Sequence, residues 1–357
     1  MKVFVVINEN NAHDEGNPYV PTLEDSIRER YDDIEFVSQK NLFWEQDDWD
    51  VVHFMWPDGL SEYLKNGFDL EGRINYLKNR GTIFIATIHN LKSHFDDEYR
   101  LRAYDIVYPL MDIMIHLWSQ SKVYMHKSFP KMEHVLIPHH IYDTKYSNIL
   151  PSKKEALKYF NLKNGTYVLS FGGIRKQSER KLIISAAKNC RDVNFVVPRF
   201  IDIPQGKINI RWIKQRLKKV YYKLRYPNLI ISGNSFISDE ELPMYYALCD
   251  ISFIQRVQIL NSGNVIMGMY MGHVIVGPRD GNVGILLQDT CNYTFDPLDE
   301  NSVASAIYDA TKAINQNLGA KNKEYSMRFW NTKKISDELY DLYKLSNINN
   351  IKKESKQ

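Results

Sequence analysis

The stretch from Ile254 to Leu287, IQRVQILNSGNVIMGMYMGHVIVGPRDGNVGILL, decides the fold class. A short apolar strand pattern precedes it, and Asn261 and Ser262 are residue types that begin helices. Apolar residues then recur at helical spacing as far as Gly272, a typical helix stop, and a second short strand pattern follows. The sequence therefore predicts a strand–helix–strand unit with the helix start at the carboxyl edge of a sheet.

This predicted helix start has two interpretations. Ligands bind at the carboxyl edge of open α/β sheets, and the first N–H groups of a helix favour anions, phosphate above all. Alternatively, the stretch is an ordinary strand–helix–strand unit in which Ser262 caps the helix and has no further role. The local pattern leaves both interpretations open.

Length and composition limit the class of protein. The chain has 357 residues, of which 44% are hydrophobic, so two domains with sizeable cores are expected. A net charge of +3 is too small to predict nucleic acid as the main partner. Three scattered cysteines without ligand spacing predict neither a disulfide framework nor a metal site. The first seven residues form a strand pattern rather than a signal peptide, and no apolar run is long enough to span a bilayer. We therefore expect a cytoplasmic protein, at most peripheral at the inner face of the membrane.

Strand and helix patterns alternate along both halves of the chain. This alternation predicts an α/β protein with two Rossmann-like, doubly wound domains that face each other across a cleft. A polar segment at 143–154 suits a linker. The predicted first domain covers 1–148, the second covers 149–329, a last amphipathic helix covers 330–345, and 346–357 form a frayed tail.

Polar and aromatic residues follow several predicted strands of the first half. The loop after the first strand contains Asn17 and Tyr19, Trp56 follows the strand at 51–55, and His89 and Asn90 follow the strand at 82–88. Such loops line ligand crevices, although a plain connector fits the first loop equally well. His89 is a candidate for substrate contact or proton handling. His53, inside its strand, is predicted to be a core residue.

One basic amphipathic helix is predicted from Ile210 to Arg225. Six apolar residues share one face, and lysines and arginines crowd the rest of the surface. This composition suits an anionic membrane surface. The alternative is a helix that packs on the second domain and leaves a solvated basic face. Binding to nucleic acid is the least favoured interpretation.

The arrangement resembles the GT-B glycosyltransferases, and among them the retaining group called family 4, in particular bacterial enzymes of surface-polysaccharide assembly. The segments that carry the resemblance cover nearly the whole chain. They are Asn17-Pro-Tyr19, Asp50–Pro57, Thr87–Asn90, Ile137-Pro-His139, Phe171–Arg175, Leu260–Gly263, Val276–Gly281, Asp296-Pro297 and Trp330. In this family the last helix normally crosses back onto the N-terminal domain.

The resemblance implies a donor, an acceptor and a metal-independent reaction. The donor would be a nucleotide-diphosphate sugar, whose leaving diphosphate Arg175 and the N–H groups at Ser262 and Gly263 would stabilise without a metal or other cofactor. His89 would lie near the transferred sugar, where it would position and polarise, because the leaving phosphate itself is thought to deprotonate the acceptor. The acceptor would be a glycan or a lipid-linked sugar. The other implied donor residues are Gly173, Lys176, Arg180, Asn261 and Asn264, and the acceptor-side residues are Asn17, Tyr19, Trp56 and Asn90.

Two departures from the family pattern affect the donor site. Ile259 and Met267 occupy the positions of a glutamate pair that usually leads into the donor helix. Ser178 replaces a lysine that commonly follows the loop arginine, a role that Lys176 or Arg180 could take over. A non-catalytic sugar-nucleotide or glycan-binding subunit is therefore the second hypothesis. A non-hydrolysing sugar-nucleotide epimerase ranks last, because the sequence offers no convincing pair of acid/base carboxylates.

Overall fold

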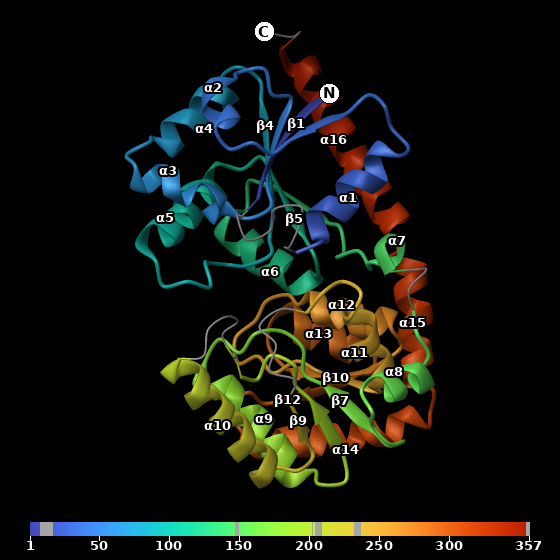
Figure 1. Cartoon of the computed structure of the whole chain (residues 1–357). Coiled ribbons are helices and arrows are strands. Elements are labelled where there is room, and N and C mark those ends of the chain that lie inside the picture. Colours follow the sequence, from blue (N-terminus) through green and yellow to red (C-terminus); the bar gives the residue numbers. More distant parts are fainter. Residues whose placement is uncertain (8–16, 147–149, 202, 204–208, 232–236, 355–357) are drawn as a thin grey trace. The chain divides into compact units, whose positions relative to one another are not determined.

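The computed structural model describes the chain except for residues 8–16, 147–149, 202, 204–208, 232–236 and 355–357 (Figure 1). It divides into two compact units, Met1–Thr144 with Trp330–Gln357, and Lys145–Phe329. The boundary predicted from the sequence lies a few residues later, between 148 and 149. Within the described residues, no helix is both long and apolar enough to cross a bilayer.

The first unit is built on a six-stranded parallel sheet in the order β2-β1-β3-β4-β5-β6. Its central strands consist of buried residues, as expected for a sheet covered on both faces. The strands are β1 Lys2–Val6, β2 Glu35–Val37, β3 Val51–Phe54, β4 Ile83–Thr87, β5 Ile113–His116 and β6 Glu133–Leu136.

Helices and short 3-10 turns connect these strands, and the last helix of the chain packs against the first. They are α1 Tyr19–Arg28, α2 Leu42–Glu45, η2 Pro57–Leu60, α3 Ser61–Lys65, α4 Leu70–Lys78, α5 Glu98–Val107, η3 Tyr108–Leu110, α6 Ser119–Ser128, α7 Asp143–Tyr146 and α16 Thr332–Glu354. Ile335, Leu339 and Tyr343 of α16 are buried in the core of this unit. Tyr343 also contacts His53 through a 2.6 Å hydrogen bond between its hydroxyl and Nδ1. The C-terminal helix therefore returns to the N-terminal unit, and His53 is a core residue, as predicted.

The second unit repeats the design with the strand order β12-β11-β10-β7-β8-β9, again all parallel. Its strands are β7 Tyr167–Leu169, β8 Asn194–Val196, β9 Leu229–Ile230, β10 Ile251–Phe253, β11 Val274–Pro278 and β12 Tyr293–Phe295. Its helices are α8 Lys153–Tyr159, α9 Gln177–Asn189, α10 Ile210–Arg225, α11 Leu242–Leu248, α12 Gly263–Tyr270, α13 Gly281–Asp289, α14 Glu300–Ile314 and α15 Leu318–Phe329.

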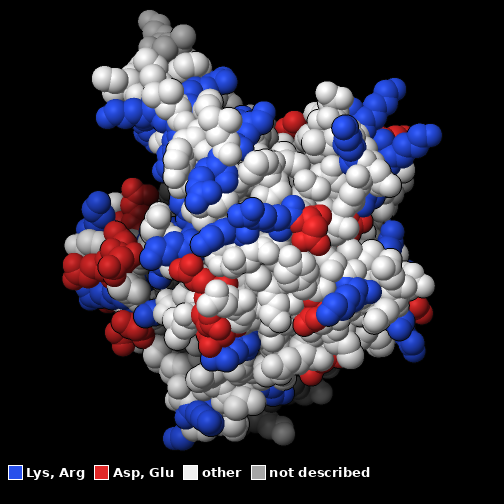
Figure 2. Space-filling view, turned by 90° about the horizontal axis from the view of Figure 1, so that it is seen from below, with Lys and Arg blue, Asp and Glu red and all other residues white. Residues whose placement is uncertain are grey.

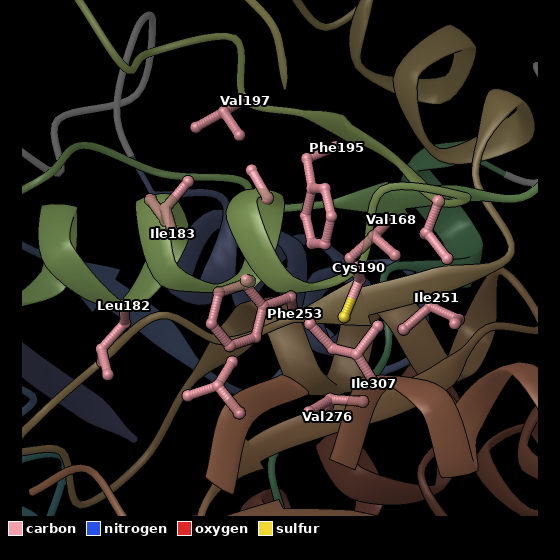
Figure 3. Close-up of a cluster of buried hydrophobic side chains, with 14 of the residues drawn as sticks. Val168, Leu182, Ile183, Cys190, Phe195, Val197, Ile251, Phe253, Val276 and Ile307 are labelled. Atoms are coloured by element: carbon pink, nitrogen blue, oxygen red, sulfur yellow. The ribbon is translucent and has the colours of Figure 1, made fainter. Parts of the chain in front are cut away.

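A continuous hydrophobic core joins one face of this sheet to α9 and α14, which pack against each other. Figure 3 shows Phe195 and Phe253 from the strands facing Ile183 of α9 and Ile307 of α14, with Cys190 beside them. All five side chains are fully buried. The core fixes the strands and leaves their carboxyl ends as the places where polar loops begin.

The structure locates two boundaries that the sequence predicted. The boundary between the two units lies within the predicted linker at 143–154, which also contains α7 and the start of α8. The last helix was predicted to stop at Leu345, whereas α16 continues to Glu354.

Candidate functional site

A glycine loop follows β7 at the carboxyl edge of the second sheet. Gly172 has a φ of +95°, a conformation that favours glycine. A Cβ atom at Gly172 would lie 3.2 Å from Nη2 of Arg256 and 3.3 Å from Nδ2 of Asn264. The backbone of this loop is therefore approached closely by two side chains that can donate hydrogen bonds.

A buried carboxylate fixes the end of the glycine loop. Oε2 of Glu179, in the first turn of α9, accepts the backbone N–H of Arg175 at 2.7 Å and Nη1 of Arg256 at 2.8 Å. The same nitrogen of Arg256 donates to the carbonyl of Gly173 at 2.9 Å. Arg256 and Glu179 are 6% and 3% exposed, so solvent screens this ion pair little. The loop conformation thus depends on a pair contributed by α9 and the segment after β10.

Three arginines gather around this loop. The side chain of Arg175 is exposed, and partial desolvation followed by the positive charge of Arg256 lowers its pKa. The Nη2 of Arg199, which follows β8, would lie 3.7 Å from a Cβ atom at Gly173. Glu179 is the acidic group that the structure places among them. This concentration of positive charge suits an anionic ligand.

The start of α12 borders the same loop. Nδ2 of Asn264 donates to the carbonyl of Phe171 at 2.9 Å, which ties the first turn of α12 to the residue before Gly172. Ser262 occupies the N-cap position, but its side chain makes no capping hydrogen bond. The simple capping role that the sequence left open for Ser262 is therefore not what the structure shows. Asn261 accepts a 2.8 Å hydrogen bond from Asn282 of α13, which anchors this loop from its other side.

The remaining predicted donor residues lie in two places. Lys176 is exposed and its Nζ lies 3.4 Å from Oε1 of Gln258. The guanidinium of Arg180 instead lies over the ring of Phe200, 4.4 Å from its centroid, beside α10. Met267, at one of the two glutamate positions, is 3% exposed in α12. Arg180 therefore lies with Phe200 rather than with the glycine loop.

The first unit carries a separate cluster of buried aromatic rings at its own carboxyl edge. His89 follows β4 and stacks on Trp56, which follows β3, with ring centroids 4.6 Å apart. Tyr19, at the start of α1, meets His89 edge-on at 4.7 Å. The structure therefore brings together three residues that the sequence analysis assigned to the acceptor side and to catalysis.

Two further histidines complete this aromatic cluster. The rings of His139 and His140 lie 4.6 Å and 4.9 Å from that of Tyr19. Nε2 of His140 contacts the carbonyl of Tyr19 at 3.0 Å. In the sequence, His139 was recognisable only as part of a motif, and no role was predicted for His140. The sequence feature that could have identified these two histidines is their position after the last strand of the first half.

Burial lowers the pKa of these histidines. Desolvation, followed by the nearby His140, lowers the pKa of His89 to about 3. Desolvation also lowers the pKa of His139 and of His140. A neutral imidazole at position 89 is a poor proton acceptor at physiological pH but can orient a hydroxyl group through a hydrogen bond.

The two predicted asparagines have local roles in the described structure. Oδ1 of Asn17 accepts the backbone N–H of Tyr19 at 3.1 Å. The carbonyl of Asn90 accepts the hydroxyl of Tyr108 at 2.5 Å. These contacts position the residues that precede α1 and those that follow β4. Within the described residues there is no group of three or more His, Cys, Asp or Glu side chains that could hold a metal ion.

Comparison with known proteins identifies the fold. No protein-family model and no curated protein sequence matches this chain. Among solved structures, a sucrose-phosphate synthase from Thermosynechococcus elongatus is similar, with a TM-score of 0.70, 15% identity, and coverage of 96% of this chain and 98% of that one. Anabaena Alr3699/HepE in complex with UDP has a TM-score of 0.68 at 11% identity, covering 96% and 99%. A glycosyltransferase from Rickettsia africae has a TM-score of 0.65 at 11% identity, covering 97% and 98%. The chain therefore has the GT-B fold of these proteins, as predicted.

Removal of Glu179 should destabilise the second unit. In Glu179→Ala, Arg256 remains buried without its partner, and we expect the free energy of unfolding to fall by about 3–5 kcal/mol. The double variant Glu179→Met with Arg256→Met, which removes both charges, should lose less. Urea unfolding followed by tryptophan fluorescence provides the measurement. If the free energy of unfolding fell less in Glu179→Ala than in the double variant, Glu179 would not be needed to stabilise the buried charge of Arg256.

The buried histidines should make stability depend on pH. The pKa of His89 is lower in the folded protein than in the unfolded chain, so the unfolded chain binds the proton first as the pH falls. The stabilisation that comes from neutral His89 is fully present above about pH 6.5 and is lost between there and about pH 3, by about 1.4 kcal/mol per pH unit. Urea unfolding between pH 7 and pH 5 should give a shallower slope for His89→Gln than for the unchanged protein. Equal slopes would mean that His89 is not held neutral by burial.

Proposed function

We propose that the protein is a glycosyltransferase that moves a sugar from a nucleotide-diphosphate sugar to a glycan or lipid-linked acceptor, in the assembly of a bacterial surface polysaccharide. The observation that carries this proposal is the glycine loop at 172–175 with Arg175, Arg199 and Arg256 around it. The GT-B fold supports it, and the solved structures of HepE in complex with UDP and with UDP-glucose show a protein of this fold with such ligands.

The proposed chemistry follows from the charge of the donor. A nucleotide-diphosphate sugar brings two phosphates, and cleavage of its glycosidic bond leaves more negative charge on the diphosphate. Arg175 would neutralise this charge with charge-assisted hydrogen bonds, and the N–H groups at Ser262 and Gly263 would add to it. Cations and N–H groups of the chain would supply the stabilisation that a divalent metal supplies in other transferases. We propose independence from metal on this basis, and retention of anomeric configuration on the family resemblance alone.

The aromatic cluster of the first unit suits the acceptor side. Sugars present apolar ring faces and hydroxyl groups, and the rings of Trp56, Tyr19 and His89 offer surfaces and hydrogen-bonding atoms of matching kinds. Because His89 is neutral, its proposed role is to orient a reacting hydroxyl group rather than to act as the sole base. The proton of the acceptor would then pass to the leaving phosphate.

Nucleotide binding tests the donor site. We expect one of UDP, GDP, ADP and dTDP to raise the melting temperature, and a ligand at a hundredfold its dissociation constant should add about 2.7 kcal/mol of apparent stability. Arg175→Ala should abolish this rise. The matched control is Arg191→Ala, which removes an exposed arginine after α9, where Nε contacts the carbonyl of Lys188. No rise with any nucleotide, or an equal rise in Arg175→Ala, would contradict the proposed diphosphate site.

A second candidate function is a non-catalytic sugar-nucleotide or glycan-binding subunit of a transferase complex. The observation that favours it is the pair of positions without glutamates, since Met267 is buried in α12 and Ile259 is partly buried. Incubation with sugar nucleotides and a panel of lipid-linked and oligosaccharide acceptors separates the two functions. Release of nucleoside diphosphate together with a glycosylated product supports the enzyme, and its yield should persist in EDTA. Tight nucleotide binding without any product would favour the binding subunit.

A further inference from the structure

Helix α10 is attached to the second unit by the side opposite its apolar residues. Four residues of the helix are partly buried, namely Trp212, Gln215, Lys219 and Tyr222, and their spacing places them on one face. The six apolar residues of the predicted face are exposed instead, with Leu224 77%, Ile210 73% and Leu217 65% accessible. The alternative interpretation, in which the apolar face packs on the second domain, is therefore wrong. We define the apolar row of α10 as Ile210, Ile213, Leu217, Val220, Tyr221 and Leu224.

Aromatic contacts explain this unusual orientation. The ring of Tyr222 meets Phe200 edge-on at 5.0 Å, and Tyr222 and Tyr226 pack against the core of the second unit. The side chain of Asn209 accepts the backbone N–H of Trp212 at 2.9 Å and caps the helix start. Figure 1 shows α10 at the outer edge of its unit. The helix is therefore anchored by tyrosines on its polar side, and its apolar row lies on the outside.

Cations border the apolar row on both sides. By helical spacing, Lys214, Lys218 and Arg225 flank one side, and Arg216 and Lys223 flank the other. The helix contains no acidic residue from Ile210 to Arg225. Figure 2, which views the molecule from below Figure 1, shows Lys and Arg side chains, clusters of Asp and Glu, and broad areas of uncharged atoms on this face. An apolar strip with lysines and arginines along its edges matches the layers of an anionic bilayer surface, where acyl chains lie beneath charged headgroups.

Other occupants fit this surface less well. A second copy of the chain would bring two rows of cations together, because a symmetric interface pairs the same patch with itself. Nucleic acid would neutralise the cations but would leave the aliphatic side chains in water. A groove on a partner protein would need acidic residues along its rim, over the same length as the lysines and arginines of α10. An anionic lipid surface can contact both features, because its acyl chains match the apolar row and its charged headgroups match the bordering cations.

We propose that α10 binds the protein to the surface of a membrane that contains anionic phospholipid, with the apolar row inserted at the level of the headgroups. This inference goes beyond the proposed function and does not depend on it, because it rests on α10 alone. It also supports a lipid-linked acceptor. Phe200, which contacts Tyr222 of α10, directly follows Arg199, which lies beside the glycine loop, so the helix and the candidate donor site share an anchoring segment.

Vesicle flotation tests this proposal. The unchanged protein should float with vesicles of phosphatidylcholine and phosphatidylglycerol, and much less with phosphatidylcholine alone, and high salt should release it. The double variant Leu217→Glu with Leu224→Glu should lower the partition coefficient by roughly tenfold or more. The matched control is Val123→Glu, which alters an exposed apolar residue of α6 in the first unit and should float normally.

The outcomes separate this proposal from the proposed function. Both leucines are exposed, so the double variant should keep its circular dichroism spectrum and its melting temperature with and without nucleotide. The proposal is overturned if the unchanged protein does not bind anionic vesicles or if the double variant binds them equally well. It is also overturned if the unchanged protein is a dimer that the double variant dissociates, because α10 would then be an interface between copies. None of these results depends on donor binding or on turnover.

Discussion

The structure depends on one constraint, which is that both sheets are parallel and covered on both faces. Strands such as β3, β4 and β10 consist of buried residues, so they cannot carry polar chemistry along their length. Polar side chains are confined to the loops that follow the carboxyl ends of the strands. The aromatic cluster of the first unit and the arginine-rich loop of the second are two results of this constraint. The two sites differ in chemistry, because aromatic side chains line the carboxyl edge of the first sheet and charged side chains line that of the second.

Within the second unit, the charge arrangement is organised by Glu179. Three arginines close to one loop would repel each other, and the carboxylate reduces this repulsion while it holds the backbone of Arg175. Arg256 is thereby committed to structure, whereas Arg175 is exposed and available to a ligand. This division of roles explains how a cationic loop can persist before any anion binds. The other two arginines, Arg199 and Arg256, belong to no motif in the sequence, and only the fold brings them to this loop.

The sequence predicted those features that depend on local pattern. Continuous apolar runs identified most strands, and the residues around Gly263 identified α12 almost to its ends. Features that depend on partners distant in sequence were missed. Arg256 and Glu179 are 77 positions apart, and nothing near either residue indicates that they form a buried pair. The composition of α10 identified its apolar face correctly, but a sequence cannot show that Tyr222 would anchor the opposite side. The extent of α16 was underestimated because its last turns are polar.

The proposed donor site requires that a nucleoside diphosphate bind at the loop after β7. Hydrogen–deuterium exchange measured by mass spectrometry, with and without saturating UDP, GDP, ADP or dTDP, tests this directly. With at least one of the nucleotides, the account predicts slower exchange in peptides that contain Phe171 to Arg175 and in those that contain Asn261 to Asn264. Slower exchange confined to other segments, or no change with any nucleotide, would contradict it.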